Sequence, residues 1–141
     1  MKLRVLSLII ICLAMLTYAG HDQLTAQTTA KEMPNIGLAS WYAEFSPGIR
    51  KTTANMEVFD DSELTCAMWD VPFGTIIKVT NLENNKTVIV RVNDRGPAKR
   101  LVRNGRIIDL TQAAFAKIAD LGEGLIQVKV EIANPGERGE L

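Results

Sequence analysis

A single acid, Asp94, stands beside Arg95 in the stretch RVNDRGPAKR, where an apolar run meets Gly96 and Pro97. Such an acid commonly caps a turn, either by accepting main-chain N–H groups or by pairing with its neighbouring arginine. A carboxylate at the mouth of a closed barrel is instead partly desolvated, which moves its pKa toward the range where it can donate a proton. The residues alone leave both roles open.

Charged residues are unevenly distributed, although the sequence holds 16 basic and 16 acidic residues. Acids without bases occupy 57–70, and bases without acids occupy 95–106. Two solvated loops that attract each other are the commoner cause of such runs. The runs could instead flank a cleft, with Arg95 and Arg106 holding an anionic or polyhydroxylated polymer. The neutral balance predicts no general affinity for nucleic acid.

Aromatic residues supply a further set of candidates: Trp41, Tyr42, Phe45, Trp69 and Phe73. Packing in the core is the default role for each of them. Trp41 and Tyr42 are adjacent, so in a strand they point to opposite faces, and we expect one of them outside or along a groove. An exposed flat ring in such a groove could stack on a sugar.

The sequence offers no other catalytic set. Its one histidine, His21, lies in a polar lead, and no group of His, Cys and carboxylates has the spacing of a metal site. There is no glycine-rich phosphate loop, and no Ser-His-Asp set can be drawn. We therefore predict no cofactor and no metal.

The elements that would hold these candidates are short. The stretch GLASWYA (37–43) predicts a strand, and 71–82 with 87–93 predicts a hairpin joined across 83–85. Alternation places three valines of the second hairpin strand on one face: Val88, Val90 and Val92. Asp94 directly follows that strand.

The C-terminal part predicts a strand at RIIDL (106–110), a helix that Thr111 caps and Gly122 ends, and a last strand at 125–133. The residues of the last strand predicted to point inward are Ile126, Val128, Val130 and Ile132. Many short strands with one short helix, and no regular alternation of the two, favour a small all-β barrel over a parallel sheet.

The N-terminal residues 1–19 have the pattern of a secretory signal peptide. Lys2 and Arg4 precede an apolar run, and small residues predict cleavage after Ala19. An uncleaved anchor helix is the alternative, but the run is shorter than the roughly 20 residues that span a bilayer. We therefore expect the protein to be secreted or periplasmic, in the cell envelope.

The rest of the chain divides into a flexible lead (20–36), one domain (37–133) and a polar tail (134–141). Cys66 is the one cysteine outside the signal peptide, so no intrachain disulfide is expected. We expect Cys66 to be a small buried apolar side chain. Cys12 follows three isoleucines and lacks the small residue that a lipoprotein signal carries before its cysteine. No lipid anchor is expected.

The order of several motifs resembles that of the rare lipoprotein A family, whose domain is a six-stranded double-psi β-barrel. The motifs are GLASWYA, KTTANMEVFD, PFGT, VTNL, NDRGP and GRIIDLTQAAFAKI. The resemblance runs from about Gly37 to Ile132. It implies the same fold here, mainly β with one short α-helix.

The resemblance also implies a lytic transglycosylase that cuts peptidoglycan glycan strands to 1,6-anhydro-muramyl ends, with a preference for peptide-poor strands. Other cell-envelope or division proteins are candidate partners. The acid of the NDRGP motif falls on Asp94, and the acid of the family's TANGE stretch falls on Glu57. Asp94 would then be the general acid and base, Glu57 the second catalytic acid, and the substrate would lie along four residues: Trp41, Tyr42, Arg95 and Arg106.

Two positions depart from the family pattern. Met68 stands where many relatives carry a histidine, and Met56 stands at the glycine of TANGE. Losing one catalytic helper typically costs about 10² to 10⁴ in rate, so we expect weak activity and a gain in turnover from Met68→His. The alternative is a noncatalytic peptidoglycan-binding or wall-assembly module that kept the barrel.

Overall fold

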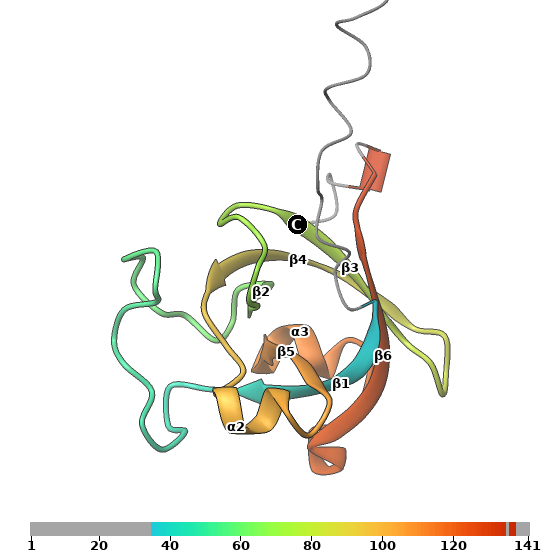
Figure 1. Ribbon diagram of the computed structural model, residues 1–141, viewed down its shortest axis with the longest axis horizontal. Coiled ribbons are helices and arrows are strands. Elements are labelled where there is room, and N and C mark those ends of the chain that lie inside the picture. Colours follow the sequence, from blue (N-terminus) through green and yellow to red (C-terminus); the bar gives the residue numbers. More distant parts are fainter. Residues whose placement is uncertain (1–34, 135, 138–141) are drawn as a thin grey trace, which may run out of the picture. The chain divides into compact units, whose positions relative to one another are not determined.

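The computed structural model describes residues 35–134 and 136–137 (Figure 1). Within them six strands close into a barrel in the order β1-β5-β2-β4-β3-β6. The strands are β1 (Ile36–Tyr42), β2 (Thr65–Ala67), β3 (Ile76–Asn81), β4 (Thr87–Asp94), β5 (Arg106–Thr111) and β6 (Leu125–Ile132). The predicted six-stranded, mainly β barrel is confirmed. The signal peptide predicted at 1–19, nearly all of the lead and most of the tail lie outside the described residues.

Short helical segments connect the later strands. They are α2 (Lys99–Val102), α3 (Gln112–Ala116) and a 3-10 turn, η1 (Leu121–Glu123), where the sequence predicted one helix. Ala114 and Phe115 of α3 belong to the barrel core, whereas α2 buries none of its side chains. The hairpin of β3 and β4 is confirmed, with antiparallel pairs from Ile76↔Arg91 to Thr80↔Thr87.

Alternating apolar residues fill the barrel. Val88, Val90 and Val92 are at most 3% exposed, and Cys66 is fully buried with a free thiol, as predicted. The prediction that Ile132 points inward is wrong. It is the last residue of β6, at the open end of the barrel, and 57% of its surface is exposed.

Thr111 does not cap α3 in the predicted way. It precedes the helix, but its hydroxyl donates to the carbonyl oxygens of Glu63 (2.6 Å) and Thr65 (3.2 Å) and makes no capping hydrogen bond. The hydroxyl therefore fastens the start of β2 to the end of β5. It satisfies main-chain acceptors in the sheet rather than donors in the helix.

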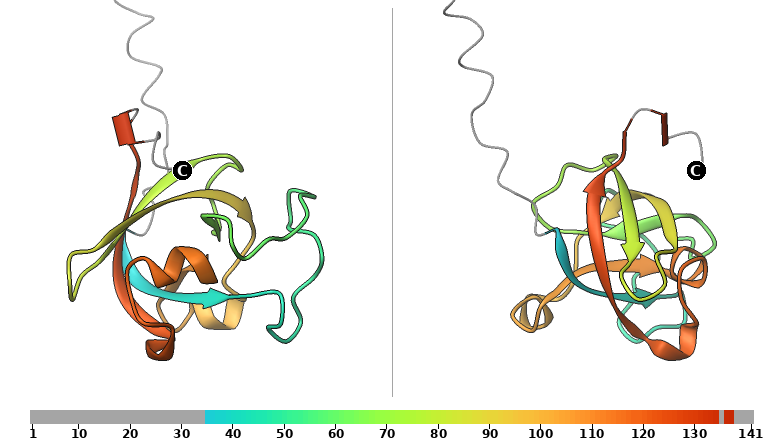
Figure 2. Two further views of the ribbon diagram at one scale, coloured as in Figure 1. Left: turned by 180° about the vertical axis from the view of Figure 1, so that it is seen from behind. Right: turned by 90° about the vertical axis from the view of Figure 1, so that its right-hand side faces the viewer.

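The longest connection between strands is the segment 43–64, which joins β1 to β2 and which we call the β1–β2 loop. Figures 1 and 2 show it extending from the barrel on the side toward which β1 and β4 run. Ile49 and Phe59 of this loop pack with Tyr42 and Ala67 in a second apolar cluster, outside the main core. The loop is thereby held against the outer face of the barrel.

Candidate active site

A shift in strand register turns Asp94 out of the barrel core. Val92 is fully buried, and strict alternation would send Asp94 inward as well. In the pairing of β2 with β4, however, Cys66 faces Val92 while Ala67 faces Asp94, which leaves Asn93 as an extra residue. A β-bulge of this kind re-aims the side chain that follows it. Asp94 is consequently half-exposed at the end of β4.

The Asp94 carboxylate is held by one of its two oxygens. Oδ1 accepts hydrogen bonds from the main-chain N–H groups of Ala54 (2.9 Å) and Arg95 (2.7 Å). Among the described residues, no hydrogen bond to Oδ2 is found. One carboxylate oxygen of Asp94 therefore caps the turn, which is the first of the two roles considered from the sequence, and the proton-donor role stays a prediction.

A hollow of about 450 Å³ lies beside this carboxylate. Asp94 and Arg95 form part of its wall, and the β1–β2 loop supplies most of the rest, including Arg50, Ala54 and Phe59. We call it the Asp94 hollow. Its size falls in the range of small-ligand sites, which is about 300 to 1,000 Å³.

A second acid, Asp109, lies in the same row of the sheet. Ala67 of β2 pairs with Asp109 on β5 at one side and with Asp94 on β4 at the other. Ser40 of β1 continues the row, since it pairs with Asp109. Paired residues of neighbouring strands share a face, so both carboxylates lie on the outer face of the barrel.

Asp109 is much less exposed than Asp94. Its side chain is 19% exposed, and its Oδ1 accepts a hydrogen bond from the Ser40 hydroxyl at 2.6 Å. Burial raises the pKa of Asp109, and the negative charge of Asp94 adds to the rise. The Ser40 hydrogen bond and the Arg106 guanidinium, 3.7 Å from Oδ1, act in the opposite direction on this pKa.

Arg106, predicted to bind substrate, thus serves this buried carboxylate. Its Nη1 also donates to the Ser40 hydroxyl oxygen at 2.8 Å. Asp109 was not predicted from the sequence, because it lies within a predicted strand and the candidate acids were those in turns and loops. The available signal was a lone acid between Ile108 and Leu110, both of which are fully buried. A charge in the middle of an apolar strand must face either solvent or a site.

Tyr42 has no ring face open to a sugar, which removes the physical basis of its predicted substrate-binding role. Its ring stacks on Phe59 with centroids 4.9 Å apart, and the residue is 8% exposed. The hydroxyl is buried and lacks a hydrogen-bond partner among the described residues. Burial first, and the charge of Asp94 next, raise the pKa of Tyr42.

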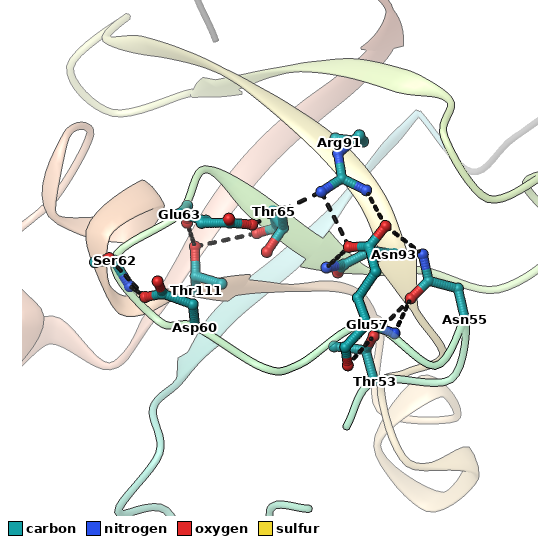
Figure 3. Close-up of polar contacts among 10 residues, drawn as sticks. All are labelled: Thr53, Asn55, Glu57, Asp60, Ser62, Glu63, Thr65, Arg91, Asn93 and Thr111. Carbon is teal, nitrogen blue, oxygen red and sulfur yellow. Dashed lines mark hydrogen bonds and ion pairs between the residues drawn. The ribbon is translucent and has the colours of Figure 1, made fainter. Parts of the chain in front are cut away.

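Both carboxylate oxygens of Glu57 accept hydrogen bonds from neighbouring side chains (Figure 3). Arg91 donates Nη1 to Oε1 at 2.7 Å and Nη2 to Oε2 at 3.0 Å. Asn55 and Asn93 add side-chain amide hydrogen bonds of 2.8 and 3.1 Å. The Arg91 hydrogen bonds, followed by those two amides, lower the pKa of Glu57 to about 2. A carboxylate in this state has no proton to donate near neutral pH.

The Glu57 contacts fasten the β1–β2 loop to strand β4. Asn55 donates its main-chain N–H to the Asn93 carbonyl (3.3 Å), one residue from the amide of Ala54 that holds Asp94. Thr53 closes the tight turn by donating to the Glu57 carbonyl at 2.9 Å. This turn therefore sets where the Ala54 N–H meets the candidate acid.

The remaining predicted site residues border the hollow or lie apart from it. Arg95 donates to the Met68 carbonyl at 2.9 Å and its guanidinium lies 3.6 Å above the Phe73 ring, so it anchors the turn after β4. Trp41 is half-buried, donates Nε1–H to the Leu121 carbonyl at 3.1 Å, and meets the exposed ring of Phe45 edge-on.

The two departures from the family pattern have different settings. Met68 is fully buried in the main core, so a side chain at this position faces away from the Asp94 hollow. Met56 is 78% exposed, lines the hollow and has a φ of 72°. That φ lies in the left-handed region that glycine adopts readily.

Three acids of the β1–β2 loop lie close together. Glu44, Asp60 and Asp61 each bring one oxygen within 4.8 Å of the others, and two of the three are exposed. Oδ1 of Asp60 accepts from Ser62, and Oδ2 of Asp61 accepts from the Glu44 N–H, so local turns use these oxygens.

Within the described residues, no helix has the length and hydropathy to cross a membrane.

The fold and the site together define a small double-psi β-barrel protein with a pair of acids on one face. A family model described as "Lytic transglycolase" matches residues 35–130, and the chain belongs to this rare lipoprotein A-like family. The resemblance noted from the motifs is confirmed.

Relatives support the same placement. The endolytic peptidoglycan transglycosylase RlpA of Campylobacter jejuni is 45% identical over 101 residues, which cover 71% of this chain and 34% of that protein. The RlpA of Rickettsia prowazekii is 39% identical over 127 residues, covering 82% and 38%. The chain therefore spans about a third of the length of these curated relatives.

Solved structures share the barrel. A Streptomyces papain inhibitor superposes with a TM-score of 0.51 at 26% identity, covering 70% of this chain and 96% of that one. The expansin of Clavibacter michiganensis superposes with a TM-score of 0.54 at 20% identity, covering 72% and 50%. The expansin likeness shows the fold alone.

Proposed function

We propose that this chain is a lytic transglycosylase domain that cleaves peptidoglycan glycan strands in the cell envelope. The observation that carries the proposal is the position of Asp94. A β-bulge places its carboxylate on the wall of a sugar-sized hollow, with one oxygen fixed by main-chain amides. Membership of the family supports the reaction, because the relatives are named endolytic peptidoglycan transglycosylases.

In the proposed reaction, the protonated Asp94 carboxyl donates its proton to the glycosidic oxygen as the bond from C1 of the muramyl sugar to that oxygen breaks. The 6-hydroxyl of the same sugar then attacks C1 and forms the 1,6-anhydro ring. Its proton returns to the Asp94 carboxylate, which restores the enzyme. No water is consumed, so the carboxylate spacings that separate hydrolase mechanisms do not apply.

In this scheme Asp109 is a second acid on the same face of the barrel as Asp94, and it does not contact the substrate. Burial and the nearby charge of Asp94 raise the pKa of Asp109, so in this scheme Asp109 holds its proton more readily than an isolated acid would. The hydrogen bond from Ser40 fixes the Asp109 side chain, and Arg106 limits the cost of its burial. Arg106 is therefore a positioning residue for Asp109 rather than a direct glycan ligand.

Glu57 has a positioning role in this scheme. Its four donors keep it ionised, and they hold the turn whose Ala54 N–H fixes Asp94. Arg95 anchors the turn after β4 through the Met68 carbonyl and the Phe73 ring. The residues left to meet the glycan in this scheme are those that line the Asp94 hollow.

A noncatalytic wall-binding module is the second candidate. It is favoured by Met68, an apolar side chain at the family's histidine position. The two candidates differ in the product expected from peptide-free glycan strands. Incubation followed by mass spectrometry should reveal 1,6-anhydro ends for the enzyme, whereas a binder would sediment with the wall material and leave the strands at full length.

A further inference from the structure

Two buried hydroxyl groups of the barrel lack a hydrogen-bond partner among the described residues, those of Tyr42 and Thr65. Leaving such a group unpaired costs stability, so each of them calls for an explanation. Tyr42 is only 8% exposed, and its ring is stacked on Phe59. A phenylalanine would fill the same space without a buried polar atom. Packing alone therefore does not account for the Tyr42 hydroxyl.

The surroundings of Tyr42 include the candidate acid. Tyr42 belongs to the same apolar cluster as Ala67 and Phe59. Ala67 is the residue that pairs with Asp94 of β4, and Phe59 lines the Asp94 hollow. Burial raises the pKa of Tyr42 most, and the negative charge of Asp94 raises it next. The Tyr42 hydroxyl is therefore close to the Asp94 carboxylate on the outer face of the barrel.

The hydroxyl and the carboxylate are complementary as donor and acceptor. Oδ1 of Asp94 accepts from the main-chain N–H groups of Ala54 and Arg95, while Oδ2 has no hydrogen bond within the described part of the chain. Because its pKa is raised, the Tyr42 hydroxyl keeps its proton near neutral pH and can act only as a donor toward an acid. An unpaired donor and an unpaired acceptor oxygen thus lie on one face of the barrel.

We propose that Tyr42 is a positioning residue whose hydroxyl donates a hydrogen bond to Oδ2 of the Asp94 carboxylate once the acid has passed its proton to the glycosidic oxygen. The inference rests on the proposed function and adds a residue to it. The hydrogen bond stabilises the negative charge that forms in this step, and it weakens when the 6-hydroxyl returns its proton to Asp94. Tyr42 itself transfers no proton. Catalytic hydrogen bonds are often long without substrate and tighten when substrate binds.

The first test compares Tyr42→Phe with Thr65→Val. Each variant removes one buried, unpaired hydroxyl and keeps nearly the same shape, so neither should lower the stability to denaturant. On peptide-free glycan strands, Tyr42→Phe should lower kcat about ten- to a hundredfold, the usual effect of losing a hydrogen bond to a charged group, and leave KM nearly unchanged.

Thr65→Val is the matched control and should keep the wild-type kcat, because Thr65 pairs with Arg91 of β4 rather than with Asp94. A wild-type kcat in Tyr42→Phe, or an equal loss of kcat in both variants, would overturn the inference.

A second test does not depend on activity. The Asp94 carboxyl can be titrated by carbon-13 NMR in the wild type and in Tyr42→Phe. Removing a donor that favours the charged carboxylate should move the Asp94 midpoint to higher pH. The charged groups in the elements around Asp94 are the same in both proteins: Arg50, Glu57, Arg95 and Asp109. The change in midpoint therefore reports the hydroxyl alone.

The pH dependence of strand cleavage should follow the same change. Asp94 must be protonated to act as an acid, so the pH at which kcat/KM declines should rise in Tyr42→Phe together with the NMR midpoint. An unchanged Asp94 midpoint would reject the role of Tyr42 even if the wild type cleaves strands. A changed midpoint in a chain that releases no anhydro ends would reject the proposed function and support the hydrogen bond.

Discussion

Asp94 and Asp109 lie on either side of Ala67, one strand away in each direction, and they share the outer face of the barrel. Asp94 borders the hollow, while Asp109 is covered and loses solvent. Two neighbouring acids in different surroundings can have different roles in catalysis, one that stays protonated and one that exchanges a proton with the substrate.

The first prediction concerns the titration of Asp109. Because burial raises its folded-state pKa, the stability that this site contributes is present below its ordinary value of 3.8 and is lost as the pH rises through the folded pKa. Asp109→Asn should flatten this part of the stability curve, measured by denaturant unfolding between pH 3 and 7. Ser40→Ala should instead move the Asp109 midpoint upward in a carbon-13 NMR titration, since it removes a hydrogen bond that lowers the pKa. A wild-type midpoint at the ordinary value would contradict this account.

The second prediction concerns Glu57. Its pKa falls from 4.5 to about 2 on folding, so the stabilisation is present above 4.5 and is lost as the pH drops toward 2. Glu57→Gln should abolish that acid-dependent step in thermal melts. The glutamine carbonyl oxygen can still accept one hydrogen bond from Arg91, so the rate of strand cleavage should fall by only about tenfold or less. A loss of 10² or more with the fold intact would make Glu57 a proton-transfer residue after all.

The third prediction uses Gly96, in the turn that covers Asp109. A Cβ at this position would lie 3.0 Å from the Ala67 Cβ and 3.4 Å from Asp109 Oδ2. Gly96→Ala should therefore displace the turn and lower both activity and melting temperature, with about 1 to 3 kcal/mol of destabilisation. Gly136→Ala is the control, because nothing lies within 4 Å of its Cβ position. Equal behaviour of the two variants would show that the turn tolerates the added methyl group.

The fourth prediction revises the expectation for residue 68. Met68 is fully buried in the main core, so Met68→His would place an imidazole among apolar side chains without reaching the hollow. Stability should fall by about 1 to 3 kcal/mol, and turnover should not rise. Denaturant unfolding and anhydro-end release measured on the same preparation check both parts. A clear gain in turnover would mean that the imidazole reaches the substrate and that Met68 explains weak activity.

Much of the barrel follows from short-range patterns in the sequence. The alternating valines of β4 and the polar turn before them predict the hairpin because burial of one face and turn chemistry act locally. The same two-residue alternation wrongly predicts that Ile132 points into the core, because alternation does not indicate where the barrel ends. It also cannot place Asp94, whose direction depends on an extra residue, Asn93, that appears only when β4 pairs with β2.

The site was only partly predictable for a related reason. The motif identified Asp94 and Glu57 as acids but not their surroundings, and the surroundings decide which of them can carry a proton. Arg91, on the strand opposite the loop, determines the state of Glu57. Asp109 joins the site through strand pairing between residues far apart in the chain, which no local pattern reports.

The most direct measurement of the central claim is release of 1,6-anhydro ends from peptide-free glycan strands by the wild type and by Asp94→Asn, with Glu83→Gln as a charge-matched control in the distant hairpin turn. Mass spectrometry should find anhydro-ended fragments for the wild type and Glu83→Gln, and a loss of at least about 10²-fold for a folded Asp94→Asn. Fragments released equally by Asp94→Asn, or by none of the three, would contradict the account.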